Sequence, residues 1–423
     1  MQVGVSLLRA ARRRAARLPV LALALALLAS TLWLPAPPAV IAVPGQAPCT
    51  HMIEAEVDVI DTNRRRFRDV APGSVLCLEA GTRGNIKLRN LHGTPSRPII
   101  VRNADGPVTI TGTLFRDGGI IISASTYLRV TGSGLDAPAC GVGRPRAEQR
   151  CGIIVDGARK GVLMNTDQGV LHDIEIDHVA VLQVSQVDKT RGIAIHPLPG
   201  QLIGGMHIHH NYVSNSLAEG IYIGSEPHGQ PFETLAKVER VHVHHNLVEN
   251  TGYDGIKLKV AIRDVAVHDN VVRHAGLSRT PAHEGGIKLA FSVGDYYRNV
   301  VIGAVEGIRT GRELDDPQSR YFGNVVVDVI AVGIDVPEDG SQVFDNMVVG
   351  SDDVGISVGG RNTVVRNNIV VDAEVPLLLG RPEVAVGNVA AGDLEGGYWD
   401  PDASTWLNPQ IVVRRLQRAL APR

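Results

Sequence analysis

One phrase recurs along the second half of the sequence and limits the fold more than any other feature. Each copy contains an apolar pair, an asparagine, a second apolar pair, and then Gly-Ile at the start of a third apolar run. The copies span residues 207–224, 241–259 and 342–358, with a weaker one at 321–336. Apart from insertions the period is about 22 residues, which is typical of the coils of a solenoid.

Three short alternating strands in one coil cannot bury a hydrophobic face by themselves. Stacked coils can, because parallel strands bond to neighbours about 4.8 Å above and below and enclose one continuous core. An asparagine amide suits the recurring turn, since it can bond both the local backbone and the asparagine of the next coil. The predicted ladder consists of Asn211, Asn246, Asn270, Asn299, Asn324, Asn346 and Asn368. The glycines before the third strand, predicted to form tight corners, are Gly192, Gly220, Gly255, Gly286, Gly307, Gly333 and Gly355.

The composition agrees with stacked β-coils. Aromatic residues make up only 4% of the chain, whereas glycines number 46 and β-branched residues are plentiful, which suits thin, regular strands. Leucine-rich repeats have a similar period, but their leucine-rich signature is missing. We therefore predict an all-β fold: a single-stranded right-handed parallel β-helix with an Asn ladder and terminal caps.

The N-terminal 42 residues have a different composition from the rest. Five arginines between Arg9 and Arg17 precede an apolar run at 18–34, and a Pro-rich stretch then leads to Ala42. This order predicts a secretory signal at 1–42 and a secreted or periplasmic (cell-envelope) protein; an uncleaved membrane anchor is the alternative. The remaining chain, 43–423, is predicted to be one β-helix domain with opening coils at 49–160, regular coils at 161–380 and a C-terminal cap at 381–423 that includes an amphipathic helix at 411–420.

The four cysteines and the charge balance narrow the setting and the partners. All four cysteines follow the signal, which fits an oxidising compartment. Our preferred pairing is Cys49 with Cys77 and Cys140 with Cys151, among the three connectivities that four cysteines permit. Acidic residues number 44 against 42 basic ones, and loss of the signal's arginines widens that excess. A nucleic-acid partner is therefore not expected.

The first coils resemble a known group of proteins. The pieces that carry the resemblance are residues 72–74 (Pro-Gly-Ser), 93–99 (Gly-Thr-Pro-Ser-Arg-Pro-Ile) and 108–112 (Val-Thr-Ile-Thr-Gly). They resemble the opening of the pectate-lyase-like superfamily, especially the chondroitinase-B-like alginate lyases, with mannuronan C5-epimerase-like proteins close to them. The resemblance implies a β-helix; it does not select among lyases, epimerases, hydrolases and non-enzymatic surface proteins.

Strand alternation predicts which side chains point away from the core. In the Gly-Ile strands the isoleucine faces inward, so the next residue faces outward. One column of these outward residues contains Tyr222, Lys257, Lys288 and Arg309, about 5 Å apart from coil to coil. The same alternation predicts exposure of His196, Lys259, Asp335 and Ser357. Three cations in line predict a track for an acidic polysaccharide.

Acidic residues stand just before the corner glycines and form a second predicted column. Its members are Glu219, Asp254, Glu284 and Glu306. They have two interpretations: surface ion pairs with the cationic column, each of small energy, or carboxylate ligands for Ca²⁺, which prefers oxygen. No organic cofactor is expected.

Insertions on the same side of the coils predict the binding face. One insertion lies between Gly224 and Val241 and contains His228, and another precedes Gly286 and contains His283. Loops inserted on one face of a solenoid are typical of its binding surface. The residues predicted to bind substrate are Tyr222, Lys259, His228, His283 and His196.

The reaction chemistry gives roles to the cationic column. A uronate lyase needs a neutralised C6 carboxylate, a base near C5 and an acid near the leaving oxygen on C4. The family resemblance implies a lysine base and an arginine partner on adjacent coils, often with calcium, and Lys288 and Arg309 match that spacing; Lys257 is the alternative base. The family's Lys-Ser and Arg-His-Gly phrases are absent here, where the sequence reads Ile-Lys-Leu and Ile-Arg-Thr.

Three other functions remain open from the sequence. A C5-epimerase would use nearly the same site and return the proton to the opposite face of the sugar. A hydrolase needs two carboxylates, which the acidic column offers. A non-catalytic carbohydrate-binding or surface β-helix would use the groove without cutting a bond.

A set of histidines lies on a different strand of the repeat. His209, His244 and His268 each precede a ladder asparagine by two residues and are predicted to stack outward. Stacked imidazoles can bind a transition metal, but a polar ladder on a solvent-facing sheet is the interpretation we favour from sequence.

Overall fold

The computed structural model describes residues 48–111, 118–133, 140, 151–183, 190–225, 231–311, 318–391, 398–400 and 405–407. Within these ranges the chain forms β-strands and two short 3-10 turns, η1 (Arg65–Phe67) and η3 (Phe232–Thr234). No helix in the described part is long and apolar enough to span a membrane. The predictions for 1–42 and 411–420 lie outside the described residues.

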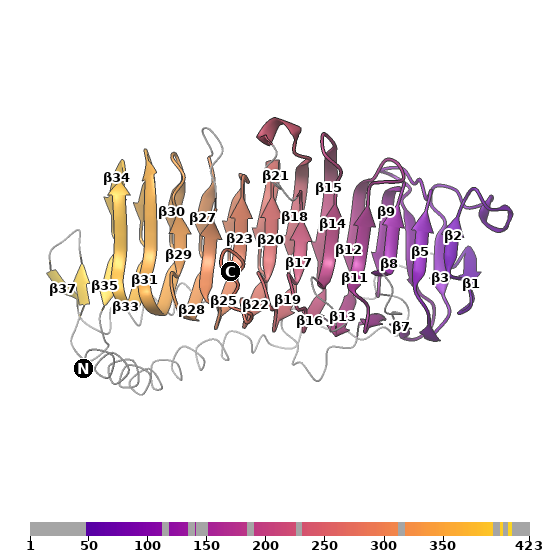
Figure 1. The fold of residues 1–423 in the computed structure, drawn as a ribbon, viewed down its shortest axis with the longest axis horizontal. Helices are drawn as coiled ribbons and strands as arrows, with labels where there is room; N and C mark the ends of the chain where they lie inside the picture. Colours follow the sequence, from indigo (N-terminus) through magenta and orange to yellow (C-terminus); the bar gives the residue numbers. More distant parts are fainter. Residues whose placement is uncertain are drawn as a thin grey trace.

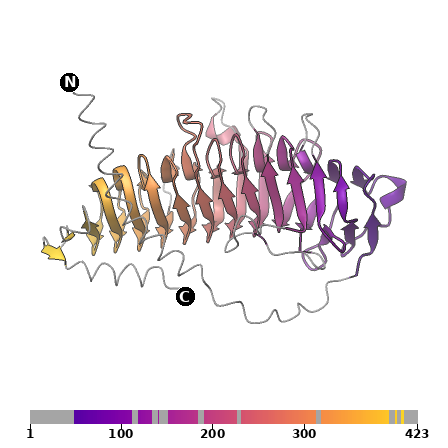
Figure 2. The ribbon, with the colours of Figure 1, turned by 90° about the horizontal axis from the view of Figure 1, so that it is seen from below.

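The strands stack into an elongated parallel β-helix, seen from two directions in Figures 1 and 2. Each regular coil supplies three strands, and each strand pairs in parallel with its equivalent in the next coil. The first strands of the coils form a 13-stranded sheet. Its members are β1 (His51–Ile53), β3 (Val75–Leu78), β6 (Ile99–Asn103), β9 (Thr126–Thr131), β12 (His172–Asp177), β15 (Leu202–His209), β18 (Lys237–His244), β21 (Ala261–His268), β24 (Asp295–Tyr297), β27 (Arg320–Phe322), β30 (Gln342–Phe344), β32 (Val364–Arg366) and β34 (Val384–Val386).

The second and third strands of each coil form two further faces. The second-strand face contains β4 (Gly81–Arg83), β7 (Val108–Thr111), β10 (Ile153–Asp156), β13 (Val179–Gln183), β16 (Tyr212–Ser214), β19 (Leu247–Glu249), β22 (Val271–Arg273), β25 (Val300–Ile302) and β28 (Val325–Val329). The third-strand face contains β2 (Val59–Asp61), β5 (Ile86–Arg89), β8 (Gly118–Ser123), β11 (Lys160–Asn165), β14 (Arg191–His196), β17 (Ile221–Ile223), β20 (Ile256–Lys259), β23 (Gly285–Ala290), β26 (Glu306–Thr310) and β29 (Ile334–Val336).

Near the C-terminal end these two faces merge. The long strands β31 (Met347–Arg361) and β33 (Ile369–Arg381) run through both faces, and β35 (Val389–Ala391) pairs with the second-strand portion of β33. Two short strands, β36 (Tyr398–Asp400) and β37 (Thr405–Leu407), pair antiparallel there. The predicted fold class is confirmed.

Alternating β-branched residues explain why these segments form strands around one core. In β20, for example, Ile256 and Leu258 are fully buried and point inward. A single cluster of buried apolar side chains continues along the stack from Ile53 to Val370. Stacking therefore gives each coil the partner surface that its own length cannot supply.

The predicted asparagine ladder is present and buried. Asn246 Nδ2 donates to Asn270 Oδ1 at 3.0 Å and to the carbonyl of Ile208 at 2.8 Å, so each amide joins two coils. The same pattern repeats from Asn211 to Asn368, and Asn388 extends it by one coil. The recurring asparagine thus satisfies buried backbone groups at a turn.

The corner glycines have a different physical reason from the one predicted. Their backbones are not left-handed: none of the seven has a positive φ. Instead, an added Cβ on Gly255 would lie 2.4 Å from Cγ1 of Val272 in the next coil, and Gly286 has the same relation to Val301 at 2.3 Å. Glycine is needed because the next coil's valine fills the space of a side chain.

Both preferred disulfides are present. Cys49 bonds Cys77 and Cys140 bonds Cys151, with Cα atoms 5.6 and 5.1 Å apart. The first links β3 to the chain just before β1. Disulfides of this kind form in oxidising compartments.

Candidate functional site

The predicted column on the third-strand face is in register. Tyr222 of β17 pairs with Lys257 of β20, which pairs with Lys288 of β23, and Lys288 pairs with Arg309 of β26. Asp335 of β29 continues the line. Residues separated by one coil in sequence are therefore direct neighbours in space.

The column is not the open stripe that strand alternation predicts, and this is a correction. Tyr222 is fully buried, Lys257 is 1% exposed and Lys288 is 6% exposed. Alternation gives the direction of a side chain but not what covers it. The segment between β22 and β23, residues 274–284, contacts both lysines: Lys257 Nζ lies 2.9 Å from His283 Nδ1, and Lys288 Nζ donates to the Ala282 carbonyl at 2.7 Å.

Arg309 is the member of the column that keeps an accessible side chain. Its side chain is 38% exposed. The guanidinium pairs with Glu306, three residues earlier on the same strand, and lies 3.6 Å from the Asp335 carboxylate. Burial raises the pKa of Glu306, partly offset by Arg309 and Lys288. Two carboxylates therefore share one guanidinium at this end of the column.

A buried charge cluster surrounds Lys257. Its Nζ lies 2.6 Å from Asp254 Oδ2, 2.9 Å from His283 Nδ1 and 3.5 Å from Glu219 Oε1. An ammonium group can only donate, so His283 Nδ1 accepts and its hydrogen is on Nε2. Burial, together with the charge of Lys257, lowers the pKa of His283. This imidazole is accordingly neutral, and its side chain remains 30% exposed.

Arg191 belongs to the cluster and was missed from the sequence. Its Nε donates to Glu219 Oε2 at 2.7 Å, and its guanidinium lies 4.2 Å above the Tyr222 ring. His196 stacks on the same ring, with centroids 5.6 Å apart. The sequence did contain an indication that Arg191 belongs to this cluster, because Arg191 directly precedes a corner glycine, as Glu219 does.

The acidic column has no carboxylate at the position that precedes Lys288. The prediction that Glu284 belongs to this column was wrong. Asp254, just before β20, forms an ion pair with Lys257 three residues later, and Glu306 does the same with Arg309 within β26. The equivalent position before Lys288 is occupied by Gly285, which pairs with Glu306. The sequence has two glycines in succession there, so Glu284 falls one residue outside the column. Among the described residues, Lys288 has no carboxylate within ion-pair distance.

The acidic column does not fit a calcium ion. Asp254 and Glu219 come close to His283, and their ligand atoms lie within 4.8 Å of one another. However, the Lys257 ammonium lies against both carboxylates, Arg191 holds the second oxygen of Glu219, and the Gly285 amide holds that of Asp254 at 2.8 Å. Calcium takes six to eight oxygen ligands, and here cationic groups take their place.

Most of the predicted substrate-binding residues do gather at this cluster. His283 and His196 are in contact with it, and the Lys259 ammonium lies 6.0 Å from the Tyr222 ring centroid. His228 lies outside the described residues. The structure therefore unites side chains from four neighbouring coils around a solvent-shielded centre.

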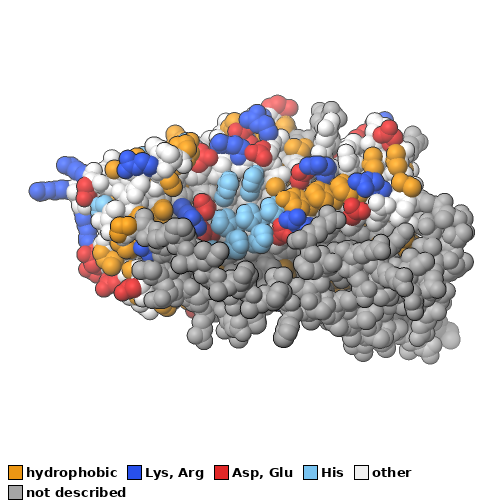
Figure 3. Space-filling model, turned by 180° about the vertical axis from the view of Figure 1, so that it is seen from behind, with side chains coloured by type: hydrophobic (Ala, Val, Ile, Leu, Met, Phe, Trp, Pro, Cys, Tyr) orange, Lys and Arg blue, Asp and Glu red, His pale blue; other side chains and the backbone are white. Residues whose placement is uncertain are grey.

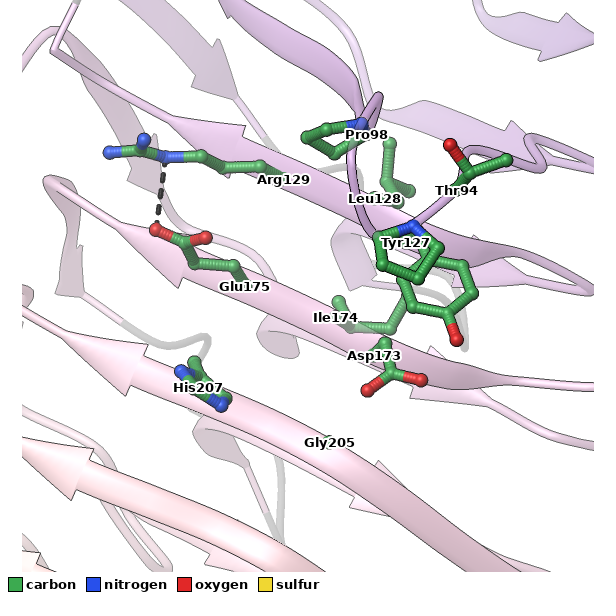
Figure 4. A pocket seen from close by; sticks show the side chains of 11 residues that line it. Thr94, Pro98, Tyr127, Leu128, Arg129, Asp173, Ile174, Glu175, Gly205 and His207 are labelled. Carbon is green, nitrogen blue, oxygen red and sulfur yellow. Dashed lines mark ion pairs between the residues drawn. The ribbon is translucent and has the colours of Figure 1, made fainter. Parts of the chain in front are cut away.

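A second concave surface, not expected from the sequence, lies on the 13-stranded sheet. Figure 4 shows this hollow of ≈ 180 Å³, with Tyr127 and Pro98 on one side and Asp173, Glu175 and His207 along the strands. Arg129 crosses it to pair with Glu175 at 3.1 Å. Its signal in the sequence was weak, because the lining comes from three strands, β9, β12 and β15, and a loop at 94–98.

Comparison with known proteins assigns no family to this chain. No family model and no curated protein matches the sequence. An alginate lyase from Paenibacillus sp. str. FPU-7 is 13% identical with a TM-score of 0.41, covering 81% of this chain and 98% of that one. A GH136 lacto-N-biosidase from Eubacterium ramulus is 14% identical with a TM-score of 0.41, covering 75% of this chain and 63% of that one. The mannuronan C-5 epimerase A-module of Azotobacter vinelandii is 12% identical with a TM-score of 0.36, covering 74% and 88%.

These three proteins are named as a lyase, a glycosidase and an epimerase. At such low identity they resemble this chain in fold alone, and the fold serves all three chemistries. The β-helix itself is established by the parallel strand order and the asparagine ladder of this chain.

Proposed function

We propose that this protein is an exported polysaccharide lyase that cleaves an acidic, uronate-containing polymer by β-elimination. One observation carries the proposal: among the residues that the structure describes, the shielded Lys288 amine has no carboxylate within ion-pair distance, unlike Lys257 and Arg309, and Lys288 is the register neighbour of Arg309 on the adjacent coil. Burial lowers the pKa of Lys288, although Asp254 and Glu306 oppose the shift. A lysine with a lowered pKa beside a fixed arginine suits proton abstraction next to a carboxylate.

The reaction assigns one task to each group. Arg309 binds the C6 carboxylate and stabilises the negative charge that develops when C5 loses its proton. The neutral Lys288 amine takes that proton, the C5–H electron pair forms the C4=C5 double bond, and the C4–O bond breaks. The leaving oxygen on C4 must gain a proton. His283, on the side of Lys288 away from Arg309, donates it from Nε2 while its Nδ1 takes up a proton from the Lys257 ammonium, which lies 2.9 Å away, so the imidazole ends neutral and Lys257 ends as an amine. Lys257 keeps His283 oriented.

Substrate access requires the segment over the column to move. Residues 276–278 are anchored to the preceding coil by backbone hydrogen bonds to Tyr253, Thr251 and Gly252, whereas Leu277 and the tip beyond it are exposed. The tip reaches the column through the Ala282 carbonyl and the His283 side chain. Movement of the tip would free the Lys288 amine and admit a sugar ring between it and Arg309.

The test is incubation of the exported protein with a panel of acidic polysaccharides, with and without Ca²⁺. The expected product is an unsaturated uronate that absorbs near 232 nm. Lys288→Ala and Arg309→Ala are expected to lower kcat/KM by at least about 100-fold, and Lys288→Arg should not restore it, because a guanidinium does not act as a base. Arg320→Ala, a matched exposed cation paired with Asp295 on the 13-stranded sheet, should leave the rate unchanged. Wild-type rates in both site variants would exclude these roles.

A hydrolase is the second candidate, for a specific reason. Glu306 and Asp335 flank one guanidinium, and the pKa of Glu306 is raised as that of a general acid must be. A hydrolase would release reducing ends without absorbance near 232 nm and would depend on Glu306. An epimerase would change the uronate composition without cutting the chain. Binding without any product would indicate a non-catalytic carbohydrate-binding protein.

A further inference from the structure

Eight of the described histidines gather on the 13-stranded sheet, away from the Lys257 cluster. Figure 3 shows them as one patch on that face. The predicted column of His209, His244 and His268 is confirmed, with successive ring centroids 4.8 and 4.9 Å apart. Beside it runs a second column of His178, His210 and His245, with centroids 5.3 and 4.8 Å apart. The remaining two, His207 and His242, stack at 4.9 Å.

The two columns meet in pairs. His209 Nδ1 lies 2.9 Å from His210 Nδ1, and His244 Nδ1 lies 2.9 Å from His245 Nδ1. The second member of each pair has a left-handed backbone, with φ of 54° at His210 and 55° at His245. That conformation turns its ring back toward the preceding histidine, which ordinary strand alternation would send to the other side. The pairing therefore cannot be seen from strand periodicity.

The carboxylate of Glu175 determines which ring nitrogen of His209, in the first pair, carries the hydrogen. His209 Nε2 lies 3.1 Å from Glu175 Oε1, so the hydrogen of His209 is on Nε2 and its Nδ1 presents a lone pair. A carboxylate behind an imidazole in this way is the usual support of a metal-ligating histidine.

We propose that the stacked pairs His209/His210 and His244/His245 form a binding site for a divalent transition-metal ion with tetragonal geometry, Cu²⁺ or Ni²⁺. Two nitrogens 2.9 Å apart, each at a metal–nitrogen distance of about 2.0–2.1 Å, subtend an angle of about 90°. That is the angle between adjacent ligands in a tetragonal complex, whereas tetrahedral Zn²⁺ requires a wider one. Within each pair the hydrogen moves from Nδ1 to Nε2 on one ring, so no net proton is released.

The neighbouring coil strengthens the site. The His209 and His244 rings are parallel within 1°, and the His210 and His245 rings within 8°. Their Nδ1 atoms therefore face the same direction on adjacent coils, with ring centroids 4.8 Å apart, so the second pair presents further imidazole beside an ion held by the first. The nearby carboxylates Asp177 and Asp269 are bound to Arg129 and Arg298 and to the imidazoles of His178 and His268, so imidazole is the principal donor type of the proposed site. Oxygen-seeking ions such as Ca²⁺ are not expected to bind here.

The test is titration of tag-free protein with Cu²⁺ near pH 7.5, followed by calorimetry and by electron paramagnetic resonance. The wild type should bind saturably, with a tetragonal copper spectrum showing coupling to imidazole nitrogen, and Ca²⁺ should not compete. The double variant His210→Asn/His245→Asn removes one ring from each pair. Asparagine accepts the left-handed conformation and already occupies the equivalent turn position at Asn367, where φ is 55°. We expect its affinity for Cu²⁺ to fall by roughly 10- to 100-fold.

The control is His207→Asn/His242→Asn, which removes two stacked imidazoles from the same face but leaves both pairs intact. It should bind Cu²⁺ like the wild type. Equal binding by the paired-site variant and the wild type would overturn the proposal. So would a wild-type spectrum without nitrogen coupling, a result that needs no variant to fold. Because the site lies on another sheet, neither result bears on lyase activity.

Discussion

The substitution Asn270→Ala tests directly whether stacking of the coils holds this fold together. Asn270 lies near the middle of the ladder and is fully buried. Its Oδ1 accepts from the Asn246 backbone N–H at 3.1 Å and from the Asn246 side chain at 3.0 Å. Its Nδ2 donates to the Val243 carbonyl at 2.8 Å and to Asn299 Oδ1 at 3.0 Å. Its Nδ2 also donates to the His268 carbonyl at 3.0 Å. Alanine removes all five bonds at a buried position.

The expected cost follows from the groups that lose their partners. The Asn246 backbone N–H loses its acceptor, and the Val243 carbonyl loses a side-chain donor. Leaving one buried group unsatisfied costs about 1–3 kcal/mol, so the two together predict a loss of roughly 2–5 kcal/mol in the free energy of unfolding. Asn270→Asp should cost at least as much, because it keeps an acceptor but sets a carboxylate oxygen against the Asn299 oxygen.

The assay is urea unfolding followed by far-UV circular dichroism. A lower midpoint with an unchanged slope would report a loss of stability rather than a change in the unfolded state. Asn63→Ala, at an exposed asparagine, is the control and should stay within about 0.5 kcal/mol of the wild type. If Asn270→Ala also stays within that range, the ladder does not support the stack and the reasoning fails.

Two further predictions follow from the coil geometry and the site. Gly255→Ala should cost about 1–3 kcal/mol, because its Cβ would meet Val272 Cγ1 at 2.4 Å; adding Val272→Ala should recover part of this, and urea midpoints of the single and double variants check it. If Lys288 is the base, the elimination rate should rise with pH as its amine loses a proton, and its lowered pKa places that rise below the usual 10.5. A pH–rate profile with no such rise below 10.5 would contradict the assignment.

The stacking of the coils could be predicted from the sequence, because the repeat determines which residues of successive coils pair with one another. Each copy fixes the ladder asparagine and the first residue of the third strand, so residues one coil apart become neighbours whatever the loops between them contain. Lys257, Lys288 and Arg309 are in line for this reason. The same regularity made the His209 and His244 stack predictable.

The features that could not be predicted depend on insertions and on local departures from the 22-residue repeat. Burial of Lys257 depends on how residues 274–284 fold back over the column, and an insertion carries no periodicity from which its path can be inferred. The position of Glu284 was misjudged because Gly285 precedes the corner glycine. The histidine pairs escaped notice because His210 and His245 have a left-handed backbone, which strand alternation does not describe.

The interruption at Gly285 links the fold to the proposed chemistry. In a stacked column, cations on successive coils are about 5 Å apart and repel one another unless carboxylates alternate with them. Lys257 and Arg309 each have such a carboxylate three residues earlier, and Lys288 has glycine instead. Burial lowers the pKa of Lys288, Asp254 and Glu306 oppose that shift, and repulsion from Arg309 and Lys257 adds to it. A purely structural ion-pair column has no reason to omit that carboxylate, whereas a site that needs a neutral amine does.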